Sequence, residues 1–188
     1  PLPAAAMPID VIEKQRTFKV GTNYHTWELP PPQPPAPWNM TAYIETLPSW
    51  EQDLLSSIEL KVSQAEFLQK VATASVLIGS DGSVQGPRAS FAWVMSDKDG
   101  KRLAQCNGAA YGAKPVSYRA EGYGILSILR FFYHLKKRWH VTNKFAVVCD
   151  NETMVKRANE KFNAKAATPN STLEAEWDLL AEIWTTLQ

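Results

Sequence analysis

From residue 74 onward the chain alternates between short β-prone runs and longer segments whose apolar residues recur at helical spacing. Three strand-like runs come first, over residues 74–81, 90–96 and 102–109. The Asp99-Gly100 pair between the second and third runs is a strong signal for a β-hairpin. The Asp81-Gly82-Ser83 segment at the end of the first run predicts a further turn.

The later segments predict one long helix, one buried strand and two further helices. The long helix begins at Ser117 and continues to about Lys137, the strand covers residues 144–149, and the last helices cover residues 152–162 and 172–187. Strands joined by hairpins are antiparallel, whereas a strand reached through a helix runs parallel to its partner. The order β-β-β-α-β-α-α therefore predicts an α/β fold. Its mixed sheet has three antiparallel strands and then a parallel one, flanked by helices.

Residues 1–73 have a different pattern, and we divide them into two segments. Residues 48–73 carry helical spacing and are interpreted as a helical lead-in to an α/β domain over residues 74–188. Residues 1–47 are interpreted as a Pro-rich arm or linker, because the run from Pro30 to Pro37 favours polyproline II. The alternative is that this run is a ligand for an SH3-like or WW-like module, which would give the arm a protein partner.

Composition limits the classes of function. The 188 residues are 45% hydrophobic and 21% charged, which is ordinary for a globular domain with an appendage. There are 20 basic residues against 19 acidic ones, and the net charge of +1 is lower than is usual for a protein that only coats phosphate backbones. An enzyme that meets phosphates through bound metal ions does not need a basic surface.

Cysteine usage and the lack of targeting signals indicate the cellular environment. Cys106 and Cys149 both lie in predicted strands, so neither a disulfide framework nor a four-ligand zinc site is expected. The sequence has no apolar run of about 18 residues and no signal-peptide pattern at its start. We expect an intracellular protein, cytoplasmic or nuclear, without a membrane partner. Because the chain begins Pro1-Leu2-Pro3 without Met, we also expect a fragment or a processed product.

Three carboxylates occupy places from which they can meet. Asp81 ends the first predicted strand and Asp150 ends the fourth, so parallel pairing would bring both to the carboxyl edge of the sheet. Glu121 lies in the first turn of the long helix and can point back to the same edge. Gly122 and Gly124 follow it, and each lowers the stability of the helix relative to Ala. A close approach of the helix to the sheet would explain why glycine occupies these positions.

Such a group of acids predicts a metal site. Converging carboxylates repel one another unless a cation lies between them, and their hard oxygens favour Mg²⁺ or Mn²⁺ over zinc. Two such ions about 4 Å apart would stabilise the attacking and leaving oxygens of an in-line displacement at a phosphodiester. Each acid alone also has a structural explanation: Asp81 as a turn residue, Glu121 as a complement to the helix dipole, and Asp150 as a helix cap. Their combination in this topology favours the metal site.

Three motifs in the same order resemble the ribonuclease H (RNase H) domains. Ser80-Asp81-Gly82-Ser83, followed by Ala89-Ser90-Phe91-Ala92-Trp93-Val94, looks like their opening hairpin. Ser117-Tyr118-Arg119-Ala120-Glu121 resembles the start of their first long helix, and Val147-Val148-Cys149-Asp150-Asn151 resembles their fourth strand and its terminal Asp. The similarity covers about residues 74–187 and is greatest to the RNase H-like domain of retrotransposon polyproteins, which follows a reverse transcriptase.

The resemblance implies metal-dependent endonucleolytic hydrolysis of the RNA strand of RNA–DNA hybrids, as part of a retroelement polyprotein. It implies an RNase H-like fold and a pair of Mg²⁺ or Mn²⁺ ions held by the catalytic acids Asp81, Glu121 and Asp150. Further nucleic-acid contacts would come from Ser83, Arg119 and Asn151.

The sequence departs from the family pattern after its fourth strand. The family continues with a fifth strand and a final helix, which bring a fourth carboxylate and often a nearby His, and we expect this chain to lack both elements. Asp178 is a candidate for the fourth metal ligand, and the alternative is a solvated residue on an amphipathic helix. The basic cluster Lys136, Lys137 and Arg138 could contact a phosphate backbone, or could simply complement the carboxyl end of its helix. Three histidines match no family position: His25, His134 and His140.

Three functions stay open at this point. The first is an RNase H-type nuclease of a retroelement polyprotein. The second is a degenerate or domesticated RNase H-like module that binds nucleic acid or protein without catalysis, which the missing last strand favours and the intact acids oppose. The third is an exonuclease or integrase relative, which shares the acidic site and differs in substrate.

Overall fold

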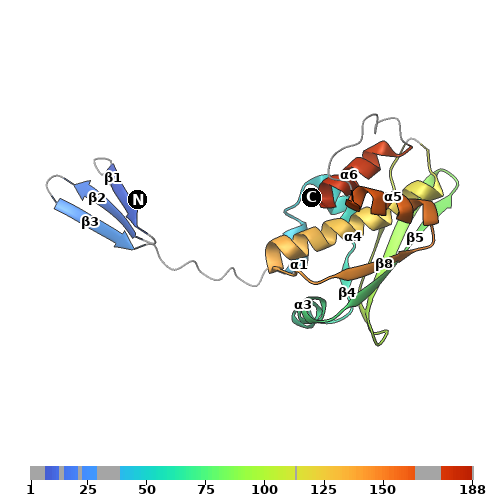
Figure 1. Ribbon diagram of the computed structural model, residues 1–188, viewed down its shortest axis with the longest axis horizontal. Coiled ribbons are helices and arrows are strands. Elements are labelled where there is room, and N and C mark those ends of the chain that lie inside the picture. Colours follow the sequence, from blue (N-terminus) through green and yellow to red (C-terminus); the bar gives the residue numbers. More distant parts are fainter. Residues whose placement is uncertain are drawn as a thin grey trace. The chain divides into compact units, whose positions relative to one another are not determined.

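The computed structural model describes the backbone of residues 7–12, 15–20 and 23–28, and the backbone and side chains of residues 39–112, 114–163 and 175–187. The chain divides into two compact units, Pro1–Trp38 and Asn39–Gln188 (Figure 1). The candidate site lies in the second unit.

The first unit contains a three-stranded antiparallel sheet in the order β1-β2-β3. Its strands are β1 (Met7–Ile12), β2 (Gln15–Val20) and β3 (Asn23–Glu28). We did not predict these strands, because the proline run dominates the composition of residues 1–47 and hides the polar–apolar alternation of β2. The run from Pro30 to Pro37 lies outside the described residues, so its role as linker or ligand stays a prediction.

The lead-in is helical in part and belongs to the second unit. It comprises α1 (Met40–Ile44), α2 (Ser49–Leu55), the short strand β4 (Glu59–Leu60) and α3 (Gln64–Thr73). Buried side chains of all three helices share one core with the sheet. Because β4 pairs with β7 through Glu59↔Gln105 and Leu60↔Ala104, the lead-in also supplies an edge of that sheet.

The main sheet has five strands in the order β4-β7-β6-β5-β8. Its long strands are β5 (Val76–Gln85), β6 (Arg88–Asp97), β7 (Arg102–Ala109) and β8 (Phe145–Cys149). The β5–β6 and β6–β7 pairs are antiparallel, and β8 joins β5 in parallel. The structure therefore confirms the predicted mixed sheet, with three antiparallel strands and then a parallel one.

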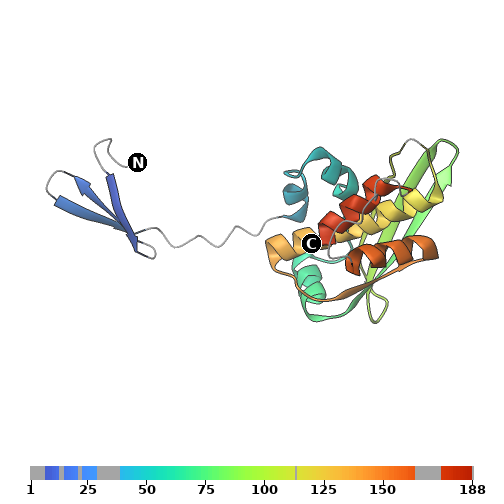
Figure 2. The same cartoon turned by 45° about the horizontal axis from the view of Figure 1, so that its top comes forward.

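The helices α4 (Ser117–Trp139), α5 (Glu152–Asn163) and α6 (Trp177–Leu187) gather on one side of this sheet (Figures 1 and 2). In β5 the side chains of Val76, Ile78 and Ser80 are buried beneath α4, whereas those between them are exposed. Leu77, Val94 and Val148 are exposed on the other face. No helix of the described part of the chain is long and apolar enough to cross a membrane.

The predicted turn at Asp81-Gly82-Ser83 is wrong, although its position relative to β8 is informative. β5 continues in register with β6 from Asp81↔Ala92 to Gln85↔Arg88, and the turn follows at Gly86, whose φ is 59°. The long ladder with β6 outweighs the local Asp-Gly signal. β8 instead stops at Cys149, opposite Ser80. Asp81 is therefore the first β5 residue beyond the parallel pair.

Candidate metal site at the carboxyl edge of the sheet

The parallel pair of β5 and β8 brings two of the predicted acids to one edge. Ser80 and Cys149 are partners at the last register position, and Asp81 and Asp150 are the residues that follow them. Both of these acids are exposed. The carboxyl ends of parallel strands are where open α/β sheets place their sites.

Gly82 allows α4 to reach this edge. A Cβ atom at Gly82 would lie 2.5 Å from the backbone nitrogen of Glu121 and 2.7 Å from the carbonyl carbon of Ala120. Because no side chain fits there, the backbones of β5 and α4 pack directly on one another. The Gly82 N–H then donates a hydrogen bond of 2.8 Å to Glu121 Oε1, which orients the carboxylate.

The two glycines beside Glu121 serve different contacts. A Cβ at Gly124 would collide with Ser80 Oγ of β5, so the predicted close approach to the sheet is confirmed there. A Cβ at Gly122 would instead collide with the side chains of Leu179 and Met154. Gly122 thus admits α5 and α6, and these contacts were not predicted from the sequence.

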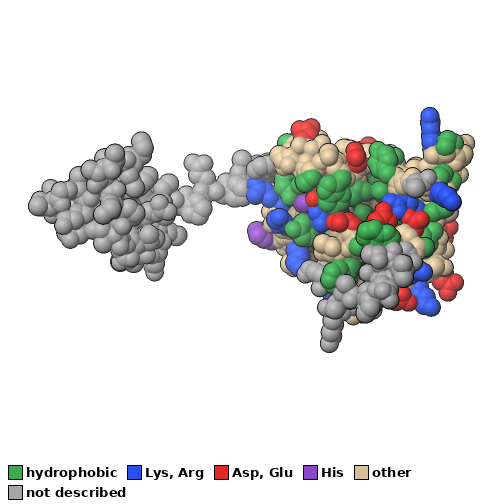
Figure 3. Space-filling view, turned by 90° about the horizontal axis from the view of Figure 1, so that it is seen from above, with side chains coloured by type: hydrophobic (Ala, Val, Ile, Leu, Met, Phe, Trp, Pro, Cys, Tyr) green, Lys and Arg blue, Asp and Glu red, His purple; other side chains and the backbone are tan. Residues whose placement is uncertain are grey.

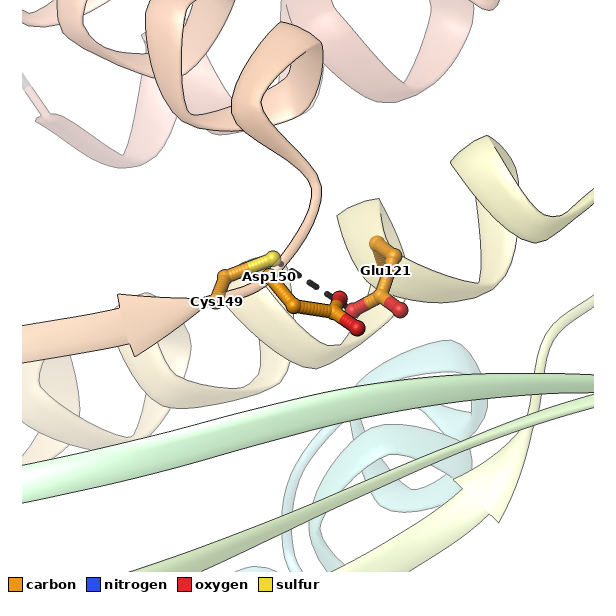
Figure 4. Close-up of side chains that lie close together, drawn as sticks. All are labelled: Glu121, Cys149 and Asp150. Carbon is orange, nitrogen blue, oxygen red and sulfur yellow. Dashed lines mark hydrogen bonds between the residues drawn. The ribbon is translucent and has the colours of Figure 1, made fainter.

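Glu121, Cys149 and Asp150 form a close cluster. One ligand atom of each lies within 4.8 Å of the others, and Figure 4 shows the two carboxylates side by side. Cys149 Sγ donates to Glu121 Oε2 at 3.4 Å. Asp81 is outside this closest group, but its charge acts on Glu121. The structure thus brings two predicted acids together, leaves the third outside the closest group but near enough for its charge to act on Glu121, and adds a cysteine that the sequence indicated only as a strand residue.

The electrostatics of the cluster favour a cation. The Glu121 side chain is only 2% exposed, and burial raises the pKa of its carboxyl. Hydrogen bonds from Gly82 and Cys149 oppose this rise, while the negative charges of Asp150 and Asp81 add to it. Burial likewise raises the pKa of the Cys149 thiol to about 11. Among the described residues no Lys or Arg forms an ion pair with Glu121 or Asp150, so the negative charge is not compensated.

The structural explanations of the single acids do not hold. Asp81 lies within a strand rather than a turn. α4 begins at Ser117 and has no acid in its first turn, so Glu121 lies too far along the helix to complement its dipole. α5 is capped by Asn151, whose Oδ1 accepts from the Met154 N–H at 3.0 Å, and not by Asp150. A nucleic-acid contact of Asn151 stays a prediction.

Arg119 and Asp178 are partners of each other. Arg119 is only 9% exposed, and its guanidinium donates to Asp178 at 3.0 and 2.7 Å, to Glu176, and to the Tyr111 carbonyl. This arrangement ties the start of α4 to the start of α6, and the hydrogen bonds from Arg119 hold the pKa of Asp178 below its usual range. Asp178 is therefore engaged away from the close acidic cluster. A contact of Arg119 with nucleic acid would require these ion pairs to open.

A groove adjoins the acidic edge. It has a volume of about 790 Å³ and crosses the ends of β5, β6 and β7. Polar and aromatic side chains line it next to Asp81, namely Ser83, Arg88, Asn107 and Tyr111. Ser83, one of the predicted nucleic-acid contacts, thus lies where a substrate could reach both it and Asp81.

The other predicted contacts lie elsewhere. Lys136, Lys137 and Arg138 are in the last turn of α4, about 22 Å or more along the helix from Glu121. On the face of the second unit that Figure 3 draws, basic and acidic side chains are interspersed and form no continuous basic area. His134 is buried between Glu51 and Tyr43, and His140 is the left-handed cap of α4, so neither joins the acidic cluster. The side chain of His25 lies outside the described residues.

Comparisons with known proteins give similarity at the level of structure only. No protein-family model matches the sequence, and no curated protein matches it. Three solved structures that resemble the chain are RNase H domains. The N-terminal RNase H domain of a Mycobacterium tuberculosis protein, solved as a fusion with maltose-binding protein, is 20% identical, with 61% of this chain and 74% of that one covered and a TM-score of 0.42.

LC11-RNase H1, isolated from compost and solved in complex with an RNA/DNA hybrid, is 21% identical over 58% of this chain and 76% of that one, with a TM-score of 0.41. RNase H1 from Halobacterium salinarum is 16% identical over 61% of this chain and 80% of that one, with a TM-score of 0.39. The fold assignment rests on the order and direction of this chain's own strands.

Proposed function

We propose that the unit Asn39–Gln188 is a metal-dependent nuclease that hydrolyses the RNA strand of RNA–DNA hybrids, within a retroelement polyprotein. One observation carries the proposal: the Glu121 and Asp150 carboxylates converge at the carboxyl edge of the β5–β8 pair, with no ion pair to a Lys or Arg of the described residues, and the charge of Asp81 acts on Glu121. An arrangement that costs electrostatic energy when empty is expected where a cation binds.

The donor set suits a hard divalent cation. Asp81, Glu121 and Asp150 offer carboxylate oxygens, which favour Mg²⁺ or Mn²⁺. When bound, such ions activate water and neutralise the charge that develops on a phosphodiester during its hydrolysis. They would also supply the positive charge that the nearly neutral chain lacks.

The chain's own groups position the carboxylates and the substrate. The Gly82 N–H holds Glu121 Oε1, while the exposed side chains of Asp81 and Asp150 remain open to an incoming strand. The groove beside Asp81 offers the exposed guanidinium of Arg88 for a phosphate, and Ser83 and Asn107 for sugar or phosphate hydrogen bonds. A nucleic-acid strand lying in this groove would present its backbone to the acidic edge.

Cleavage of a labelled RNA–DNA hybrid in Mg²⁺ or Mn²⁺ tests the proposal. We expect Glu121→Gln and Asp150→Asn to lower the rate at least about a hundredfold, because each removes a metal ligand. Asp99→Asn, in the distant β6–β7 turn, is the matched control and should retain wild-type cleavage. Cleavage that persists in Glu121→Gln, or in the presence of a chelator, would contradict the mechanism. Single-stranded RNA and duplex DNA in parallel reactions identify an exonuclease or integrase relative by its substrate.

A module that binds without cutting is the second candidate. The observation in its favour is that Asp178 is bound by Arg119 and that Asp81 lies outside the closest group, which leaves two acids, Glu121 and Asp150, within 4.8 Å of each other. On this alternative the hybrid binds and is not cleaved at any metal concentration. Fluorescence anisotropy on the same labelled hybrid separates the two functions.

A further inference from the structure

Cys149 places a sulfur atom among the carboxylate oxygens of the acidic edge. Its Sγ lies within 4.8 Å of a ligand oxygen of Glu121 and of Asp150, and it donates a hydrogen bond to Glu121 (Figure 4). An ion with bonds of about 2.0–2.3 Å joins donors that are up to about 4.6 Å apart. Small side-chain rotations would therefore let one ion contact all three residues.

The buried hydroxyl of Ser80, beside Cys149, is a second and independent feature of this edge of the sheet. The two residues are register partners in the parallel pair, and both side chains point to the helix-covered face of the sheet. Ser80 is 8% exposed, and its Oγ has no hydrogen-bond partner among the described residues. A buried hydroxyl without a partner costs about 1–3 kcal/mol. It lies against Gly124, one helical turn after Glu121.

We propose that Cys149 Sγ is a metal ligand and that, with Glu121 and Asp150, it gives this chain a site for a thiophilic divalent ion such as Zn²⁺ or Cd²⁺. Thiolate is a soft ligand that favours these ions strongly over Mg²⁺. Binding replaces the S–H hydrogen bond to Glu121 with a sulfur–metal bond, and the thiol proton passes to the solvent. A thiophilic ion then competes with Mg²⁺ or Mn²⁺ for the same carboxylates. The inference shares the metal site of the proposed function but does not require hydrolysis.

Cys106 provides a matched control within the same sheet. Its Sγ is buried and donates to the Leu54 carbonyl at 3.4 Å, and it belongs to no cluster of metal-ligating groups among the described residues. Cys106→Ser and Cys149→Ser make the same chemical change, the replacement of a sulfur by an oxygen, in β7 and in β8 respectively. Only the second of them changes the acidic edge.

The test is a titration of the reduced protein with Co²⁺ and Cd²⁺ in the absence of nucleic acid. Sulfur-to-metal charge-transfer absorption is expected in the wild type and in Cys106→Ser, and not in Cys149→Ser. We expect Cys149→Ser to weaken Cd²⁺ binding at least about tenfold, with a much smaller effect on Mg²⁺. Absence of the band in the wild type, or its survival in Cys149→Ser, would overturn the inference.

Thiol modification of the wild type provides a second measurement that does not depend on the folding of a variant. Cd²⁺ should slow alkylation of Cys149, read by peptide mass, whereas Mg²⁺ at saturating concentration should slow it less. Equal rates with and without Cd²⁺ would also overturn the inference. Hybrid cleavage without the charge-transfer band leaves the proposed function standing and removes this one. The charge-transfer band without hybrid cleavage would support Cys149 as a metal ligand and would contradict the proposed nuclease function.

Discussion

The Gly82 N–H donates to Glu121 Oε1 at 2.8 Å, and at this bond β5 and α4 meet without a side chain between them. Gly82→Ala is expected to lower the free energy of unfolding by about 1–3 kcal/mol, because the new Cβ would lie 2.5 Å from backbone atoms that cannot rotate away. Displacement of α4 should weaken Mn²⁺ binding as well. Urea denaturation and calorimetry measure the two effects.

Gly79→Ala is the control for this experiment. Gly79 is in the same strand, and a Cβ there has nothing within 4 Å. We expect this variant to match the wild type in Mn²⁺ affinity and to change stability by less than about 0.5 kcal/mol. Equal losses in the two variants would show that Gly82 has no special role.

Asp178→Asn distinguishes an ion-pair partner from a metal ligand. Because Asp178 is bound by Arg119 and shares no hydrogen bond with Glu121 or Asp150 among the described residues, the substitution should act independently of the metal site. We therefore expect the Mn²⁺ affinity to change by less than about twofold. Its side chain is half exposed, so the loss of stability should not exceed about 1 kcal/mol. Calorimetric titration of Asp178→Asn and of Glu121→Gln with Mn²⁺, side by side, measures the two affinities. A comparable loss of metal binding in both variants would identify Asp178 as a ligand after all.

His134 predicts a pH dependence of stability. Its Nε2 contacts the Glu51 carboxylate, and its Nδ1 is 2.9 Å from the Tyr43 hydroxyl. Burial lowers the pKa of His134 below its usual 6.5, against the effect of Glu51. The folded protein therefore holds a neutral ring while the unfolded chain takes up a proton, so the free energy of unfolding should fall as the pH is lowered through 6.5.

The measurement is urea denaturation of the wild type and of His134→Gln at about pH 7.5 and about pH 5.5. The variant keeps hydrogen-bonding groups for Glu51 and Tyr43 but does not titrate, so it should lose less stability. Titration of Glu51 affects the free energy of unfolding only at lower pH. Although burial raises its pKa, the hydrogen bonds from Arg130 and His134 hold it below 4.5. Parallel losses in the two proteins would exclude His134 as the cause.

Arg88→Gln tests the groove beside Asp81. Loss of one phosphate contact should weaken hybrid binding several-fold and reduce the slope of log affinity against log salt by about 1, with the rate at saturating substrate nearly unchanged. Lys98→Gln, one residue beyond the other end of β6, is the matched control. Salt-dependent anisotropy gives the slopes. If the two variants are indistinguishable, the strand does not lie in this groove.

Local sequence patterns predicted the elements of the sheet well, because alternation along β5, β6 and β7 and the spacing along α4 are local properties. The Asp81-Gly82 pair misled for the opposite reason: the chain continues straight there because of pairing with β6 and contact with α4, both remote in the sequence. β1, β2 and β3 were not predicted because the proline run dominates the composition of residues 1–47 and only β2 has a short alternation of polar and apolar residues.

The acids of the site were predictable from strand ends and helix starts, whereas their partners were not. Nothing near Cys149 in the sequence signals a hydrogen bond to Glu121, 28 residues earlier. The bond from Arg119 to Asp178 spans 59 residues in the same way. Such contacts depend on how α4, α6 and β8 pack, and local propensity does not contain that information.

The parallel junction of β5 with β8 also determines when the site forms. Asp81 and Asp150 are about 70 residues apart, and closing so long a loop is expected late in folding. Before β8 joins the sheet, a metal ion has only scattered carboxylates to bind. Metal added to the refolding chain should therefore leave the folding rate nearly unchanged and slow unfolding instead. The ion would act as a latch on the finished sheet rather than as a template for building it.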